Sequence, residues 1–194
     1  MRALDSLEQD HRLLWRLTEA LEAYATALEA GLDLRAGDLR DIVQSFRTVA
    51  DYRNFEKVEE VLIPVLVRHG FDYNLEILDD GRRVHAKVRY LIEVLHQSAE
   101  RELNWSLDER LRIVRAARSL VEEQRQLAIQ REAELFPEIE SRIPPPALGQ
   151  LTEQLCQFDE VSDSRWPEVD VAALSQSVLA RYASTLPSAR ELAR

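Results

Sequence analysis

The chain has 194 residues, of which 45% are apolar, and this length and composition suit a folded protein with one core. Its 35 acidic residues outnumber the 25 basic ones, and the net charge of −10 argues against nucleic acid or an anionic membrane as a partner, because both attract basic surfaces. The single cysteine, Cys156, excludes an internal disulfide framework or a cysteine-ligated cluster. Because the chain has only five glycines and seven prolines, the composition favours an all-α protein.

The N-terminal half predicts two long helices. Apolar residues recur every three or four positions along residues 4–30, which indicates a first helix that ends at Gly31. A second helix is predicted from Asp38, as its N-cap, to His69. Pro64 lies inside this second pattern, so we expect the helix to be locally distorted there.

The C-terminal half predicts two further long helices and two short ones. After the loop 71–74, an inward stripe at every third or fourth position indicates a third helix. The capping-box sequence from Ser106 to Glu109 begins the fourth, and the prolines at 144–146 break the chain after it. Shorter helices are predicted at 148–161 and 171–182.

Four long amphipathic helices with short links predict an antiparallel, up-and-down four-helix bundle. We assign this bundle to residues 1–143, and a C-terminal helical extension packed on it to residues 144–194. No stretch approaches the roughly 18 apolar residues of a membrane-spanning helix, and the N-terminus has no apolar leader. We therefore expect a cytoplasmic protein.

His11 and His85 occupy inward positions on the first and third predicted helices, where a bundle would otherwise place leucine. Two imidazoles in one layer indicate a metal site when carboxylates from the other helices complete it. The alternative is a pair of core histidines, each hydrogen-bonded to a carboxylate or a carbonyl.

The other two long helices present poor metal ligands at the matching positions. Asn54 and Val58 lie on the second helix, and Leu127 and Arg131 lie on the fourth. The guanidinium of Arg131 stays protonated, and its charge would repel a metal ion in a core of low dielectric constant.

Several segments resemble one known family. Ala50-Asp-Tyr-Arg-Asn-Phe-Glu-Lys-Val-Glu-Glu-Val-Leu-Ile-Pro64 is similar to Ala-Asp-x-x-His-His-x-Lys-Glu-Glu-x-x-Leu-Phe-Pro in the second helix of the hemerythrin-like, cation-binding (HHE) family. Leu127-Ala-Ile-Gln-Arg-Glu-Ala-Glu-Leu-Phe-Pro137 resembles that family's His-Ile-x-Lys-Glu-x-x-x-Leu-Phe-Pro in the fourth helix. The segments around His11 and His85 resemble the motifs of its first and third helices, and the resemblance covers about residues 3–183.

The resemblance implies a non-haem di-iron site, with a histidine from each helix and a glutamate from the second and fourth. It also implies a role in handling oxygen, nitric oxide or peroxide, or in iron-linked sensing. Carried over residue by residue, only His11 and His85 persist. Asn54 and Val58 replace one His-x-x-x-Glu pair, and Leu127 and Arg131 replace the other.

We therefore expect a hemerythrin-like protein that has lost most of its di-iron ligands. It would act as a non-enzymatic apo bundle, with a regulatory or interaction role and no cofactor. Arg131 is expected to be buried where a metal once lay, and a buried guanidinium needs a partner. Glu8 is the first candidate, followed by Glu59, Asp80 and Glu134. In the alternative, a rotation of the helix carries Arg131 to the surface.

A second hypothesis keeps a metal. His11 and His85, together with Glu59 or with Glu8 or Glu56, would bind one iron or zinc weakly. Such a protein would be a sensor or storage protein in an oxygen, nitric oxide or iron response.

A third hypothesis makes the chain an interaction module, whose partner is an unknown protein or a second copy of itself. Trp105 and Trp166 lie at helix ends or in loops and are candidate contact residues, with packing of the tail as the alternative for Trp166. Trp15 is expected in the core or beneath the tail.

Overall fold

In the computed structural model the described residues are 4–32, 34–71, 76–101, 105–165 and 170–182, without the side chains at 36, 76–80 and 163–165. This part of the chain is helical and contains no strand, so the predicted all-α class is confirmed. No helix within it is both long enough and apolar enough to cross a membrane.

The helices follow one another in two long runs and four separate segments. The separate ones are α1 (Asp5–Glu29), α4 (Glu76–Ala99), α7 (Pro145–Arg165) and α8 (Val171–Tyr182). The first run joins α2 (Ala36–Phe46), η1 (Arg47–Phe55), η2 (Val58–Leu62) and α3 (Ile63–Arg68), and the second joins α5 (Leu107–Gln130), η3 (Arg131–Leu135) and α6 (Phe136–Arg142).

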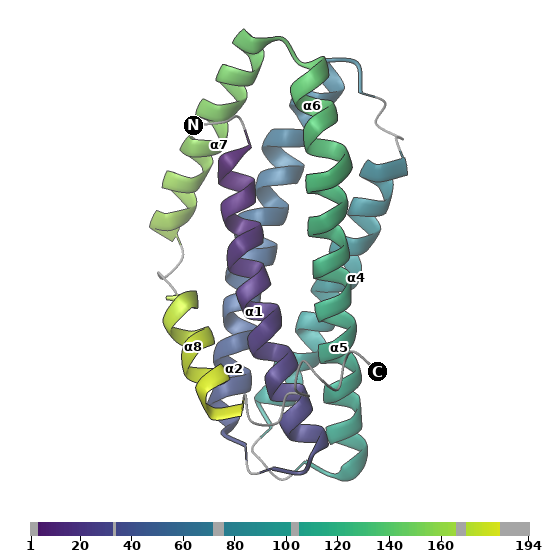
Figure 1. The fold of residues 1–194 in the computed structure, drawn as a ribbon, viewed down its shortest axis with the longest axis vertical. Coiled ribbons are helices and arrows are strands. Elements are labelled where there is room, and N and C mark those ends of the chain that lie inside the picture. Colours follow the sequence, from purple (N-terminus) through teal and green to yellow (C-terminus); the bar gives the residue numbers. More distant parts are fainter. Residues whose placement is uncertain (1–3, 33, 72–75, 102–104, 166–169, 183–194) are drawn as a thin grey trace, which may run out of the picture.

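The long helices lie side by side along the long axis of the molecule (Figure 1). α1 packs against α2 and α5, and α4 also packs against α2 and α5, so these helices surround a common core. α8 covers α1 and α2 near one end, and α7 packs against α1, η1 and η2 nearer the other. The C-terminal helices therefore lie directly on the first two long helical segments of the chain.

Some predicted boundaries agree with the structure and others differ. Ser106 caps α5 through the predicted capping box with Glu109. The last helix spans Val171–Tyr182 as predicted. In contrast, α7 is longer than the predicted 148–161 at both ends: it begins at Pro145, because proline is tolerated in the first turn of a helix, and it ends at Arg165. Asp38 is not an N-cap: α2 begins at Ala36, and the Asp38 carboxylate accepts hydrogen bonds from Arg181 and Tyr182 of α8.

Each of the two long runs is widened into a π-helix just before a proline. η2 precedes Pro64 and η3 precedes Pro137, and each proline lies in the first turn of the α-helix that follows. A proline ring clashes with the carbonyl four residues earlier, which here belongs to the π-helix. The wider turn relieves that clash, which explains the distortion expected at Pro64.

The apolar core consists of two clusters. The larger runs from Leu14 toward the end of α1 and includes Phe55, Val88 and Leu127, whereas the smaller contains Leu7, Val58 and Leu135 among others. On α1 the two clusters are separated by about two turns, between Leu7 and Leu14, and His11 lies within this stretch. A polar layer thus divides the core.

Candidate functional site

Four buried polar side chains from four helical segments make up this layer. His11 comes from α1, Asn54 from η1, His85 from α4 and Arg131 from η3, and none is more than 4% exposed. The layer includes both histidines that the sequence analysis identified. It also includes Asn54 and Arg131, two of the four residues at positions where the resemblance implies metal ligands. We call this set the polar layer.

Arg131 is buried, as expected, but its partners differ from the prediction. One terminal nitrogen donates a hydrogen bond to Asn54 Oδ1 at 3.0 Å, and the other donates to His85 Nε2. Glu8, the expected partner, instead lies 3.8 Å from the guanidinium of Arg12. Burial lowers the pKa of Arg131 to about 10, against the opposing charge of Glu59, so the guanidinium is still protonated at neutral pH.

His85 bridges Arg131 and a carboxylate. Its Nε2 accepts from Arg131, while its Nδ1 lies 2.8 Å from Glu59 Oε1, so a neutral ring with its proton on Nδ1 satisfies both contacts. Burial lowers the pKa of His85 to about 4, helped by the charge of Arg131 and opposed by Glu59. The ring also stacks on Phe55, with centroids 3.8 Å apart. His85 is therefore a neutral link between a cation and an anion.

His11 has the same kind of outer partner, a carboxylate, but its inner nitrogen has no hydrogen-bond partner. Its Nδ1 lies 2.8 Å from Glu132 Oε1, and its ring stacks against Phe136. Its Nε2 is buried and has no hydrogen-bond partner. Burial lowers the pKa of His11, so this ring is neutral as well. The sequence placed Glu132 off the inward stripe, and its role on His11 was missed.

The polar layer does not fit a di-iron centre. Glu59, the predicted residual ligand, contacts the outer nitrogen of His85, and the inner nitrogen is taken by Arg131. Val58 and Leu127 belong to the apolar clusters. Within the described residues, no group of three or more histidine, cysteine or acidic side chains is arranged to hold a metal ion.

Of the other expected partners of Arg131, Glu134 is exposed, and the side chain of Asp80 lies outside the described residues. The burial of Arg131 therefore depends on Asn54 and on the His85–Glu59 pair, with the carboxylate acting through the ring.

A second buried polar cluster lies beside the layer and was not predicted. The ammonium of Lys57 is fully buried and contacts Asp10 at 2.7 Å, Ser6 at 2.8 Å and Asp159 at 2.5 Å. Arg53 lies 3.0 Å from the same Asp10. Because Asp159 belongs to α7, this cluster ties the C-terminal extension to the bundle. One feature of the sequence could have drawn attention to this cluster: lysine is rare in the chain, which has only Lys57 and Lys87.

The predictions for two tryptophans are wrong. Trp105 is only 7% exposed, and its indole donates a hydrogen bond to the carbonyl of Ser98, so it is not a contact residue. Trp15 is 41% exposed rather than buried, with the guanidinium of Arg125 over its ring. Trp166 lies outside the described residues.

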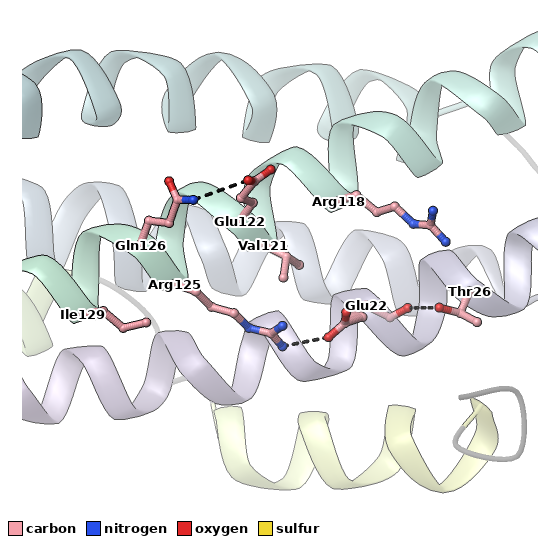
Figure 2. A pocket seen from close by; sticks show the side chains of 8 residues that line it. All are labelled: Glu22, Thr26, Arg118, Val121, Glu122, Arg125, Gln126 and Ile129. Atoms are coloured by element: carbon pink, nitrogen blue, oxygen red, sulfur yellow. Dashed lines mark hydrogen bonds and ion pairs between the residues drawn. The ribbon is translucent and has the colours of Figure 1, made fainter. Parts of the chain in front are cut away.

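A surface groove of about 550 Å³ runs between α1 and α5 (Figure 2). Across it, Arg125 donates to Glu22 at 2.8 Å, and Figure 2 shows these two side chains pointing toward each other. Val121 and Ile129 supply apolar lining, and Ile129 is 57% exposed. Exposed apolar atoms beside an arginine are found in protein-binding surfaces, although glutamate is depleted there.

No protein-family model, no curated protein and no solved structure matches this chain.

Proposed function

We propose that this chain is a hemerythrin-like, antiparallel four-helix bundle that has lost its di-iron site and acts as a non-enzymatic regulatory or interaction protein. The observation that carries the proposal is the hydrogen bond from Arg131 to Nε2 of His85. The buried guanidinium thereby uses the lone pair of His85 Nε2, the nitrogen that would otherwise bind a metal ion.

The chemistry of the layer supports the loss of metal. Iron sites of this type need several anionic or imidazole ligands, whereas the layer offers two neutral histidines, an amide and a cation. A divalent ion beside the guanidinium would be strongly repelled, because a buried site screens charge poorly.

The outer contacts of the two histidines support an origin as a metal layer. A histidine that binds a metal through one ring nitrogen usually donates the N–H of the other to a carboxylate. Glu59 on His85 and Glu132 on His11 both have this arrangement. The supporting carboxylates are thus retained although the residues that would complete the site are gone.

The groove between α1 and α5 supports a role in binding, since it combines exposed apolar atoms with paired charges. Its partner would be another protein or a second copy of the chain. Mass measurement over a range of concentrations tests the second copy: dimer formation that is lost in Ile129→Glu would place the self-contact there, and a monomer throughout would leave a different protein as the partner.

The loss of metal is tested by iron analysis of protein expressed with added iron. We expect much less than one iron per chain in the purified protein. Tightly bound iron near one or two ions per chain would contradict the proposal.

A second candidate is a residual iron- or zinc-binding sensor or storage protein that uses His11 and His85. The buried Nε2 of His11, which has no hydrogen-bond partner, favours this candidate. For this candidate we expect zinc or ferrous iron to bind the wild-type protein. The binding should be lost in His11→Ala, while the helical content of the variant is unchanged. Equal binding by both proteins would contradict it.

A further inference from the structure

The buried cluster around Lys57 holds an amine against a carboxyl group, away from solvent. Lys57 and Asp10 are both 0% exposed, and Nζ of Lys57 donates a hydrogen bond of 2.7 Å to Oδ2 of Asp10. The carboxyl carbon lies one bond beyond that oxygen, so it is within about 4 Å of the amine nitrogen. An amine and a carboxyl group held at this separation are the two reactants of an amide bond.

Burial favours the uncharged, reactive forms of these two groups. It raises the pKa of Asp10, although the charges of Lys57 and Arg53 oppose the rise. Transfer of one proton from the ammonium to the carboxylate gives a neutral amine and a neutral acid, and it removes the cost of burying two charges. The neutral amine has the electron pair that an attack on the carboxyl carbon requires.

Two neighbouring side chains are placed to assist such a reaction. Asp159 Oδ1 lies 2.5 Å from the lysine nitrogen, so this carboxylate can take a proton from the amine and pass it to the oxygen that leaves. Nε of Arg53 lies 3.0 Å from Oδ1 of Asp10, the oxygen on which negative charge develops during the attack. Ser6 accepts a hydrogen bond from the same amine and donates one to Asp159, which holds both groups in place.

The charges of the cluster also favour the product. Two cations, Lys57 and Arg53, lie against two carboxylates, Asp10 and Asp159. An amide between Lys57 and Asp10 removes one charge of each sign and leaves Arg53 paired with Asp159 at 3.6 Å. These two side chains are 26% and 18% exposed, so the remaining ion pair is partly solvated, and a released water molecule can leave on their side.

We propose that Lys57 and Asp10 form an intramolecular isopeptide bond, which joins α1 covalently to the helical run that contains η1 and η2. A bond forms between Nζ of Lys57 and Cγ of Asp10, and the Cγ–Oδ2 bond breaks. The ammonium gives up two protons, which leave with Oδ2 as one water molecule, so nothing is oxidised or reduced. The inference does not depend on the loss of a metal site.

The mass of the protein distinguishes an amide from an ion pair, because only the amide has lost a water molecule. In the denatured wild-type protein, the main species should be lighter than its sequence by one water. Lys57→Arg keeps the positive charge but has no amine that can form the bond, so it should have the full mass of its sequence. A wild-type protein of full mass, or the same loss of water in Lys57→Arg, would overturn the proposal.

Tryptic peptides of the wild-type protein locate the bond. Trypsin does not cleave after a lysine whose amine is part of an amide, so residues 54–68 should stay in one piece and be joined to residues 3–12, which contain Asp10. Fragmentation of the joined peptide should place the link between Asp10 and Lys57. Separate peptides, with cleavage after Lys57, would overturn the proposal.

The second lysine provides an internal control. Lys87 also lies close to a carboxylate, 2.5 Å from Glu123, but its side chain is 52% exposed, so this pair should remain an ion pair. After reaction with an amine-reactive ester in denaturant, the wild type and Lys57→Arg should carry the same number of labels, and Lys87→Arg should carry one fewer. One more label on the wild type than on Lys57→Arg would show that the Lys57 amine is free, which would overturn the proposal.

Discussion

Arg131 and His85 form a hydrogen bond in the middle of the core, in which the guanidinium donates to Nε2 of the imidazole. On the other side of the ring, Nδ1 lies 2.8 Å from Glu59. The neutral imidazole therefore connects a buried cation to a half-buried carboxylate. In the family that the sequence resembles, this position is implied to hold a metal; here a side chain of the chain itself fills it.

Acidification should destabilise the protein through His85. Burial holds the pKa of His85 at about 4, below the ordinary value of 6.5, so between these values the unfolded chain binds a proton that the folded chain excludes. The stabilising contribution is complete above about pH 6.5 and is lost progressively as the pH falls toward about 4. Urea unfolding at about pH 7.5 and about pH 5 should differ by about 2 kcal/mol from this residue.

The control for this pH effect is His85→Gln, whose amide can accept from Arg131 and donate to Glu59 without titrating. The free energy of unfolding of this variant should depend less on pH than that of the wild type. His11 should still make the variant less stable in acid, because burial also lowers the pKa of His11. An unchanged slope in His85→Gln would contradict the assignment.

Replacing Arg131 by methionine should change the free energy of unfolding by only about 1 kcal/mol or less. The variant loses two hydrogen bonds but also removes a charge whose burial is costly, and the two effects oppose each other. Methionine is also flexible enough to fill the space. Chemical unfolding measures this difference, and a loss of several kcal/mol would show that the guanidinium is a major source of stability.

Replacing Lys57 by methionine should be much more damaging. The ammonium is fully buried between Asp10 and Asp159, and its removal leaves buried carboxylates without their closest cation. We expect a loss of about 3–5 kcal/mol in the free energy of unfolding.

The other lysine provides the matched control. Lys87 pairs with Glu123 at the surface, and its ammonium side chain is 52% exposed. Lys87→Met should therefore cost less than about 1 kcal/mol in the same assay. Similar losses in the two variants would mean that the buried cluster does not hold α7 on the bundle.

The predicted residues of the polar layer came from helical periodicity. Spacing of three and four placed His11, His85 and Arg131 inward, and all three are buried in the layer. The partner of Arg131 could not be found in this way. When every helix is treated as a regular α-helix, Glu8 falls at the same level of the bundle as Arg131. In the structure, Asn54 and Arg131 lie in π-helical segments, whose wider turns change which side chains face each other.

Contacts between distant parts of the chain were also beyond periodicity. Lys57 and Asp159 lie in separate helices, and nothing in either local pattern pairs them. The same holds for Trp105, which precedes α5 and whose indole donates a hydrogen bond to Ser98 of α4. The prediction for Trp15 was wrong for a related reason. A residue just off an inward stripe is buried only if another helix covers it, and Trp15 is 41% exposed.

Restoring the four replaced positions should bring iron back. Asn54→His, Val58→Glu, Leu127→His and Arg131→Glu together reinstate the ligands that the resemblance implies. The combined variant, expressed with iron, should retain bound iron, while Arg131→Met alone should not. A combined variant that keeps its helical content but contains no more iron than wild type would argue against a hemerythrin-like frame.

We infer that the side chain of Arg131 fills the place that the resemblance assigns to a metal. Anomalous diffraction at the iron absorption edge, from a wild-type crystal grown with ferrous iron, detects any metal in this layer. We expect density for the Arg131 guanidinium between Asn54 and His85 and no anomalous peak in the layer. An iron peak at about 2.0–2.3 Å from Nε2 of His11 or His85, with Arg131 displaced, would contradict it.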